Sequence, residues 1–333
     1  MEIIRGLTIV APKTYGAPSG TFMQNRNSLK YFTGTAIYLV SLWAMLPLLV
    51  RMTDYQSAGA FSLAIALCNL FFTISVSGMR SFQISDIKKQ YTDQQYLLAR
   101  LISITIGFAA CLLFLAFMSY EKMHSIVIAL FMVYKSFEAF SDLCYGYYQN
   151  HGSQFTNICI SLTIKGIVQF LAFYLGLLIF GDLRHAVILM ATSILVIIAV
   201  YDLPRIRMNV KPFLRLSKHN WERALNLFKR CSPMIVVLLA APLMQAIPRM
   251  YFEDRFSIEL FGIFSSVAAP VLIITVFIGS ALVPYVPKFA EYVNSNNYKS
   301  LTKLLLAITG VALSLGGLSI IAAFYFGECI TKA

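Results

Sequence analysis

Long runs of apolar residues divide this chain, and they limit its possible folds more than any other feature. A helix needs about 20 apolar residues, at a rise of about 1.5 Å each, to cross the ~30 Å hydrocarbon core of a bilayer. About nine stretches reach that length. The expected spans are residues 31–50, 57–79, 100–119, 124–147, 155–180, 184–202, 232–250, 258–284 and 301–326.

Composition agrees with a chain that folds in lipid. Hydrophobic residues make up 58% of the sequence and charged residues 13%, whereas soluble domains have about 45–50% and about 25%. The runs are too long for strands and lack the alternation of a membrane barrel. The sequence therefore predicts an all-α polytopic membrane protein, a helical bundle of about nine spans.

The net charge of +12 is placed between the spans and not along one face of a soluble module, which argues against a nucleic-acid partner. Lys and Arg gather in alternate connections, and such connections usually face the cytoplasm. The first of these regions is the N-terminal arm, residues 1–30, which shows no signal-peptide pattern. We expect a cytoplasmic N-terminus.

Four regions follow from this division. They are the cytoplasmic arm (1–30), a first six-helix transmembrane lobe (31–202), a basic cytoplasmic connection (203–231) and a partial second transmembrane lobe of three helices (232–333), which we expect to be truncated. Within the connection, "WERALNLFKRCSP" places Trp221, Leu225 and Phe228 at helical spacing opposite basic residues. It is either a short helix lying on an anionic leaflet or a solvated linker.

Motifs for enzymatic or metal chemistry are absent from the sequence. The six cysteines show no CxxC or Cys/His spacing, and the four histidines share no pattern. Walker, GxSxG and HExxH motifs are also missing. We therefore expect neither an enzyme nor a cofactor or metal site.

The fourth expected span carries Lys135, Glu138 and Asp142 on one helical face. Charged groups at membrane depth are costly, so this face should point into the bundle. A short turn makes the fifth span an antiparallel neighbour, and counting residues from that turn places Lys165 level with Lys135 and Glu138. The four groups either form ion pairs that fix helix register or line a polar cavity for a charged substrate or a proton.

Arg80 and Arg249 end the second and seventh spans. Arginine suits phosphate, because its planar donors never lose their charge, but arginines at span ends also commonly anchor helices at the interface. The seventh and eighth spans contain several prolines, which kink helices and occur in the broken helices of transporters.

Three stretches resemble a known family: "LLVRMTDYQSAGAFSLAIALCNLFFTISVSGMRSFQISDI", "YGYYQNHGSQFTNI" and "IPRMYFEDRFSIELFGIF" with the prolines near residues 281–287. They are similar to bacterial polysaccharide-biosynthesis membrane proteins, the O-antigen and capsule repeat-unit flippases of the multidrug/oligosaccharidyl-lipid/polysaccharide exporter superfamily. The resemblance covers residues 31–325. Family members carry twelve or more spans, whereas this chain ends after about nine.

The resemblance implies export of an undecaprenyl-pyrophosphate-linked repeat unit across the inner membrane by alternating access. Arg80 and Arg249 would then hold the pyrophosphate, while Lys135, Glu138, Asp142 and Lys165 line the cavity or couple an ion. Expected partners are the lipid-linked oligosaccharide, membrane lipids and a polysaccharide polymerase or glycosyltransferases. Two alternatives stay open: a multidrug or cation antiporter of the same superfamily, and a non-transporting scaffold for polysaccharide assembly.

Overall fold

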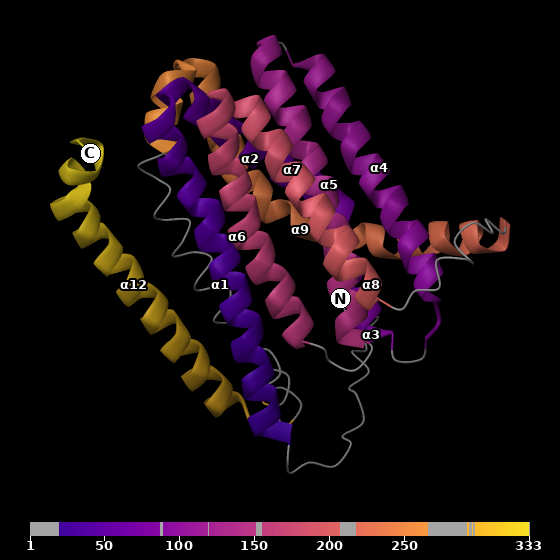
Figure 1. Ribbon diagram of the computed structural model, residues 1–333. Coiled ribbons are helices and arrows are strands. Elements are labelled where there is room, and N and C mark those ends of the chain that lie inside the picture. The colour runs from indigo at the N-terminus through magenta and orange to yellow at the C-terminus, as the bar shows by residue number, and fades with distance from the viewer. Residues whose placement is uncertain are drawn as a thin grey trace, which may run out of the picture. The chain divides into compact units, whose positions relative to one another are not determined.

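The computed structural model describes residues 20–86, 89–118, 120–150, 155–206, 218–265, 292, 295 and 297–332. Within these residues every regular element is a helix (Figure 1), so the expected all-helical architecture is confirmed. The elements are α1 (Gly20–Met52), α2 (Tyr55–Val76), α3 (Met79–Ser85), α4 (Asp93–Phe117), α5 (Lys122–Asn150), α6 (Phe155–Phe180), α7 (Leu183–Ile197), the π-helix η1 (Ile198–Asp202), α8 (Leu203–Arg205), α9 (Lys218–Arg255) and α12 (Tyr298–Lys332). Residues 258–265 are also helical.

Six helical segments of the described chain are long and apolar enough to cross a membrane. They are Lys30–Met52, Tyr55–Ile84, Asp93–Phe117, Phe155–Phe180, Leu183–Arg205 and Asn220–Arg255. Most of the expected span at 258–284 lies outside the described residues. A membrane protein is therefore supported, whereas the total of about nine spans stays a prediction.

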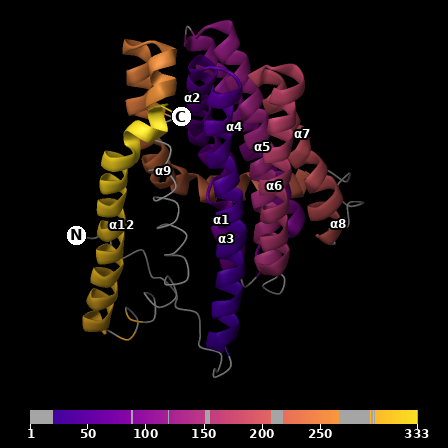
Figure 2. The same cartoon turned by 60° about the vertical axis from the view of Figure 1, so that its left-hand side comes forward.

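The chain forms two compact units, one of residues 33–273 and one of residues 1–32 with 274–333. The second unit contains α12. The first contains the packed bundle, in which α5 contacts α2, α4, α6 and α7, and α6 packs along α7 (Figure 2). The division into lobes at 31–202 and 232–333 stays a prediction.

An aromatic core holds the middle of this bundle together. The ring of Phe61 on α2 lies 5.6 Å from that of Phe131 on α5 and 5.2 Å from that of Phe173 on α6. Glycine allows α6 and α7 to approach closely, because a Cβ atom added at Gly176 of α6 would lie 2.5 Å from the Cα atom of Ala186 on α7. Small residues commonly bring membrane helices together in this way.

Two irregular turns interrupt the helices of the bundle. α2 ends where Ser77 and Gly78 adopt left-handed conformations, with φ of 52° and 61°, and the short α3 then begins. α7 ends in the π-helical turn η1, whose last residue is Asp202. π-Helical turns are rare and often mark functional sites. Both breaks turn polar groups toward α5.

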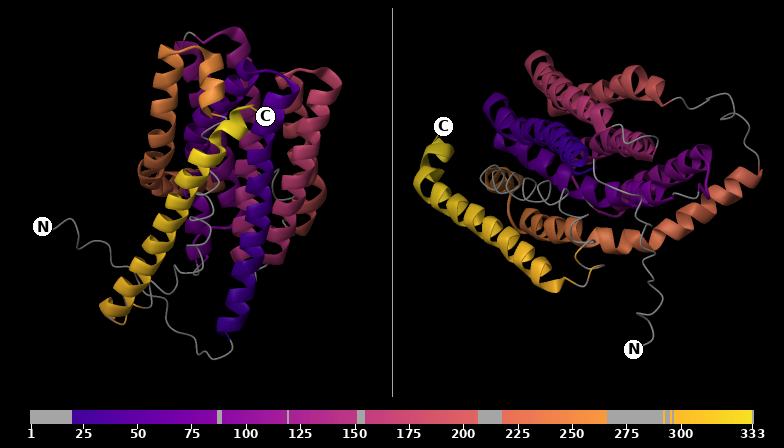
Figure 3. Two further views of the ribbon diagram at one scale, coloured as in Figure 1. Left: turned by 90° about the vertical axis from the view of Figure 1, so that its left-hand side faces the viewer. Right: turned by 90° about the horizontal axis from the view of Figure 1, so that it is seen from below.

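α9 begins at Lys218 and runs without interruption to Arg255, with Pro233, Pro242 and Pro248 inside it. Residues 218–231 of the expected basic connection are thus helical and continuous with the seventh span, while 207–217 lie outside the described residues. The first part of α9 runs across the axis of α4, and the later part turns toward the far end of the bundle (Figures 1 and 3).

Candidate functional site

The polar face of α5 is the best candidate site, because its charged side chains lie inside the bundle against four other elements. Near its middle, the Nζ atom of Lys135 lies 2.7 Å from Oε2 of Glu138, one helical turn away. The same ammonium group lies over the ring of Phe72, 4.8 Å from its centroid. Lys135 is 7% exposed, and the aromatic ring and the carboxylate together stabilise its charge.

Asp142 lies one turn further along α5, between two arginines. Its Oδ1 atom accepts a hydrogen bond from NH1 of Arg80 at 3.2 Å, and its Oδ2 atom accepts one from NH2 of Arg100 at 3.0 Å. The two guanidinium groups differ in environment: the side chain of Arg100 is fully buried, whereas that of Arg80 is 19% exposed. Arg80 also donates from Nε to Oε1 of Gln149, at 3.3 Å.

Arg100 has a second role at the break between α2 and α3. Its NH1 group donates to the backbone carbonyls of Ser75 and Val76, at 3.1 and 2.8 Å. Carbonyls at the end of a helix lack helical partners and are costly to bury without a donor. One buried guanidinium therefore satisfies the end of α2 and pairs with Asp142 on α5.

Lys165 on α6 forms a third charged group, with Asp202 of η1. Its Nζ atom contacts Oδ2 of Asp202 and also donates to Oγ of Ser141 at 2.8 Å and to the hydroxyl of Tyr145 at 3.0 Å. Asp202 accepts a further hydrogen bond from Oγ of Ser161, at 2.8 Å. All three donors of the ammonium group are used, so this pair is well suited to hold α5, α6 and η1 in register.

Uncharged polar groups extend the site toward α1. The hydroxyl groups of Tyr38 and Tyr134 lie 3.0 Å apart, and that of Tyr134 donates to Oε1 of Gln169 at 3.1 Å. Tyr38 is on α1, so the hydrogen-bond chain crosses from α1 through α5 to α6. Polar contacts therefore join α5 to both α1 and α6.

The structure separates charged groups that residue counting placed together. Lys165 lies beside Ser141 and Tyr145, not beside Lys135 and Glu138. Side chains on a helix lean toward its N-terminus, and α5 and α6 run in opposite directions. Lys165 therefore leans toward the turn between the helices and Lys135 leans away from it. The structure therefore pairs Lys135 with Glu138 and Lys165 with Asp202, and it does not show the four charges in one cluster.

Arg80 and Arg249 do not face one site. Arg80 contacts the last two turns of α5, whereas Arg249 lies near the end of α9, whose Glu253 and Asp254 lie near Tyr120, just before the start of α5. The structure therefore does not bring Arg80 and Arg249 together at one site, and a shared pyrophosphate contact stays an untested expectation. Helix numbering could have shown it, because the second and seventh spans both end at these arginines but run in opposite directions.

Two functional positions were missed in the sequence. The span expected at 100–119 begins at Arg100, whereas α4 begins at Asp93, so that an apolar run surrounds the arginine. Asp202 was passed over as the end of a span. The signal for both was the same: a charged residue flanked on both sides by apolar residues, which needs a buried partner.

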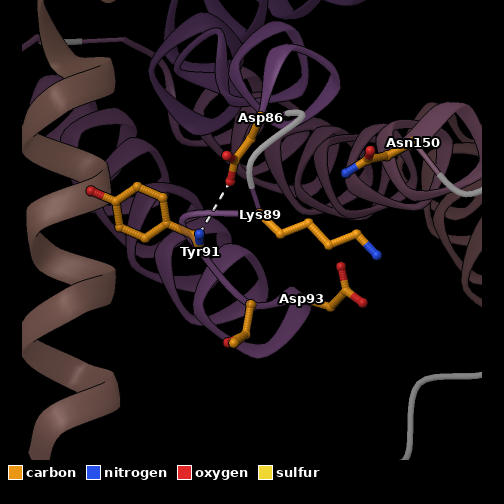
Figure 4. A pocket seen from close by; sticks show the side chains of 6 residues that line it. Asp86, Lys89, Tyr91, Asp93 and Asn150 are labelled. Atoms are coloured by element: carbon orange, nitrogen blue, oxygen red, sulfur yellow. Dashed lines mark hydrogen bonds between the residues drawn. The ribbon is translucent and has the colours of Figure 1, made fainter.

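A polar pocket of about 240 Å³ lies where α4 begins, lined by Asp86, Lys89, Tyr91, Thr92, Asp93 and Asn150 (Figure 4). Asp86 shapes it, because its carboxylate accepts hydrogen bonds from the backbone N–H groups of Gln90 and Tyr91 at 2.9 and 3.1 Å. The described residues hold no group of three or more His, Cys, Asp or Glu side chains that could bind a metal ion.

Comparison with known proteins gives one informative relative. The chain is similar to a protein described as "Capsular polysaccharide biosynthesis protein CapF" from Staphylococcus aureus. The two are 22% identical over 304 residues, which cover 90% of this chain and 74% of the relative. No protein-family model matches the chain. No solved structure matches it either.

Proposed function

We propose that this protein is a flippase that moves an undecaprenyl-pyrophosphate-linked oligosaccharide repeat unit across the bacterial inner membrane by alternating access. The repeat unit, once moved across the membrane, would serve the synthesis of O-antigen, capsule or exopolysaccharide. The observation that carries the proposal is the similarity to the capsular polysaccharide biosynthesis protein, which extends over 90% of this chain. A role in polysaccharide biosynthesis rests on that similarity, and the flipping activity rests on the site.

The polar face of α5 supports a transport role. Charged groups inside a membrane bundle are costly, and they commonly mark the path of a charged substrate. Arg80 is the residue best placed to meet a phosphate, because its side chain is partly exposed and Arg100 also holds Asp142. A phosphate could thus approach Arg80 without leaving Asp142 unpaired.

The break between α2 and α3 supports the same proposal. Membrane transporters commonly place discontinuous helices beside the substrate site. Here the break lies next to Arg80, the second residue of α3, and is held by the buried Arg100.

For the topology and partners of the flippase, we propose about nine spans, a cytoplasmic N-terminus, and a polymerase or glycosyltransferases as partners in polysaccharide assembly.

The test is the leaflet in which the lipid-linked repeat unit resides. In a strain lacking the gene, we expect the repeat unit to accumulate where a membrane-impermeant oxidant cannot reach it in spheroplasts. The oxidant should reach it after the membranes are inverted. Complementation with the intact gene should restore access from outside.

The same experiment separates the alternatives. A scaffold for polysaccharide assembly would lower polymer while leaving the distribution between leaflets unchanged, and that outcome would overturn the flippase proposal. An antiporter for drugs or cations would leave both the polymer and the lipid-linked intermediate unchanged.

A further inference from the structure

The first part of α9, residues 218–231, is too polar to be part of a membrane span, and it runs across the axis of α4 instead of along it. We refer to it as the crossing segment. The helical segment that contains most of it, Asn220–Arg255, is 36 residues long, although only part of that length is apolar. At about 1.5 Å per residue that is ~54 Å, far more than the ~30 Å hydrocarbon core. The crossing segment runs across the axis of α4 (Figures 1 and 3). When α4 spans the bilayer, the crossing segment lies along the membrane plane.

One face of the crossing segment packs on the bundle. Ala224, Leu227 and Cys231 are buried, in a cluster with Met79 and Tyr96. These positions follow the spacing of one helical face. The face fixes how the crossing segment is rotated about its own axis.

A second face is apolar and only partly covered. Trp221, Leu225 and Phe228 recur at helical spacing, about 100° round the helix from the buried face. The side chain of Trp221 is 41% exposed, and those of Leu225 and Phe228 are half-buried. An aromatic residue with an indole N–H group is typical of the level where the bilayer meets water.

The third face is cationic. Arg223, Lys229 and Arg230 are exposed, and over the whole crossing segment four Lys or Arg residues stand against the single acidic residue Glu222. Long basic side chains opposite an apolar face are the pattern of helices that lie in the interface of an anionic membrane. Because the buried face sets the rotation, the apolar and cationic faces have fixed directions.

We propose that the crossing segment lies in the lipid headgroup layer at the end of the bundle where α4 begins, and that it binds anionic phospholipid there. Trp221, Leu225 and Phe228 enter the acyl boundary, and Arg223, Lys229 and Arg230 contact the phosphate groups. The occupant is a lipid surface and not a soluble protein, because the exposed apolar stripe is narrow and the four Lys or Arg residues of the segment outnumber its one acidic residue, Glu222.

Three contacts tie the crossing segment to the start of α4. Nε2 of Gln95 donates to Oδ1 of Asn220 at 3.3 Å, and NH1 of Arg223 donates to the carbonyl of Gln90 at 3.4 Å. The guanidinium of Arg230 lies over the ring of Tyr91, 6.0 Å from its centroid. A lipid headgroup bound by the crossing segment would therefore lie beside the pocket that Tyr91 and Asp93 line.

The two tryptophans of the chain, Trp43 and Trp221, allow a direct test. The full chain carrying Trp43→Phe, with Trp221 as its fluorophore, is placed in nanodiscs of phosphatidylcholine alone or with phosphatidylglycerol. We expect nitroxide on the lipid headgroup to quench Trp221 more than nitroxide deep in the acyl chain. We also expect spin-labelled phosphatidylglycerol to quench it severalfold more than spin-labelled phosphatidylcholine.

Removal of the cationic face should abolish the lipid preference. In the triple variant Arg223→Gln, Lys229→Gln and Arg230→Gln, Trp221 should be quenched equally by the two labelled lipids. The protein with an intact cationic face should behave in the same way at about 1 M salt, where the screening length is only ~3 Å. Lys229→Gln alone, which leaves the contacts of Arg223 and Arg230 with the start of α4 in place, should lower the ratio in part. Lys122→Gln, which replaces an exposed lysine at the start of α5, outside the crossing segment, is the matched control. It should retain the full ratio of quenching by the two labelled lipids.

Two results would overturn the proposal. One is quenching of Trp221 by aqueous acrylamide with no effect of headgroup nitroxide, which would place the segment in water. The other is equal quenching by the two labelled lipids before any substitution, which would show an interfacial helix without selectivity for anionic lipid. Neither readout depends on transport.

Discussion

Lys165 on α6 and Asp202 at the end of η1 form an ion pair in which the two side chains are 2% and 0% exposed. Ser141, Tyr145 and Ser161 complete the hydrogen bonds of the two charges. Such a pair contributes little net stability while it is intact, but removing one partner leaves an uncompensated charge in the core. Its contribution is therefore to the arrangement of α5, α6 and α7.

Substitution of either partner should destabilise the protein. We expect Lys165→Met and Asp202→Leu each to lower the free energy of unfolding by about 3–5 kcal/mol, and the double variant to recover most of that loss. Thermal unfolding in detergent, with membrane abundance measured in parallel, checks this. Equal losses in the double and single variants would contradict the pairing.

Arg100→Lys should be nearly as damaging as Arg100→Ala. A single ammonium group cannot satisfy Asp142 and the carbonyls of Ser75 and Val76 with the planar fork that the guanidinium provides. We expect a loss of about 2–4 kcal/mol for either change, because buried acceptors are left without donors. The melting temperature measures it, and a lysine variant of normal stability would show that the helix end needs no such donor.

Arg80→Gln should reduce polysaccharide export while leaving membrane abundance close to normal. Asp142 keeps Arg100 as its partner, so the fold loses little, whereas the proposed phosphate contact is lost. Surface polysaccharide and immunoblots of membrane fractions give the two readouts. Arg51→Gln, at the exposed end of α1, is the control. Full export by the Arg80 variant would exclude a role in substrate binding.

The all-helical architecture was predictable from the sequence, because apolar run length and the positions of helix breaks are local properties. The span expected at 155–180 coincides with α6, and the one at 184–202 with α7 and η1. A short helix was one of two alternatives expected within residues 203–231, but its unbroken continuation into the seventh span was not predictable, because it depends on the packing of Ala224 and Leu227 on the bundle. Tertiary contacts decided that boundary.

The site was predictable in part. The inward direction of the charged face of α5 was a confirmed prediction, because buried charge must face protein or water. The partners of these charges were not predictable, because they depend on the lean of each side chain and on the π-helical turn that presents Asp202. No residue spacing in the sequence indicates that Lys165 reaches Asp202.

Packing of α6 on α7 should be sensitive to one added methyl group. The Cβ atom of Gly176→Ala would lie 2.5 Å from the Cα atom of Ala186, so the helices must move apart. We expect a loss of about 1–3 kcal/mol in the free energy of unfolding. Gly310→Ala, which meets no atom within 4 Å, is the control. An unchanged melting temperature for both would show that the helices can separate freely.

The orientation of the chain can be tested at Asn226, which is exposed on the crossing segment. In a variant without native cysteines, Asn226→Cys should react with a membrane-impermeant thiol reagent in inverted vesicles. In intact spheroplasts it should be protected, because basic connections face the cytoplasm. Labelling from outside would reverse the predicted topology.

The buried pair on α6 and η1 also constrains the order of membrane insertion. During synthesis, Asp142 emerges after Arg80 and Arg100, so its partners are already in the membrane when α5 enters. Lys165 emerges 37 residues before Asp202 and has no such partner waiting. Because an isolated ammonium group is costly in hydrocarbon, α6 must stay beside the translocon or near the interface until α7 arrives. α6 and α7 then move from the translocon into the lipid together, as a helical hairpin.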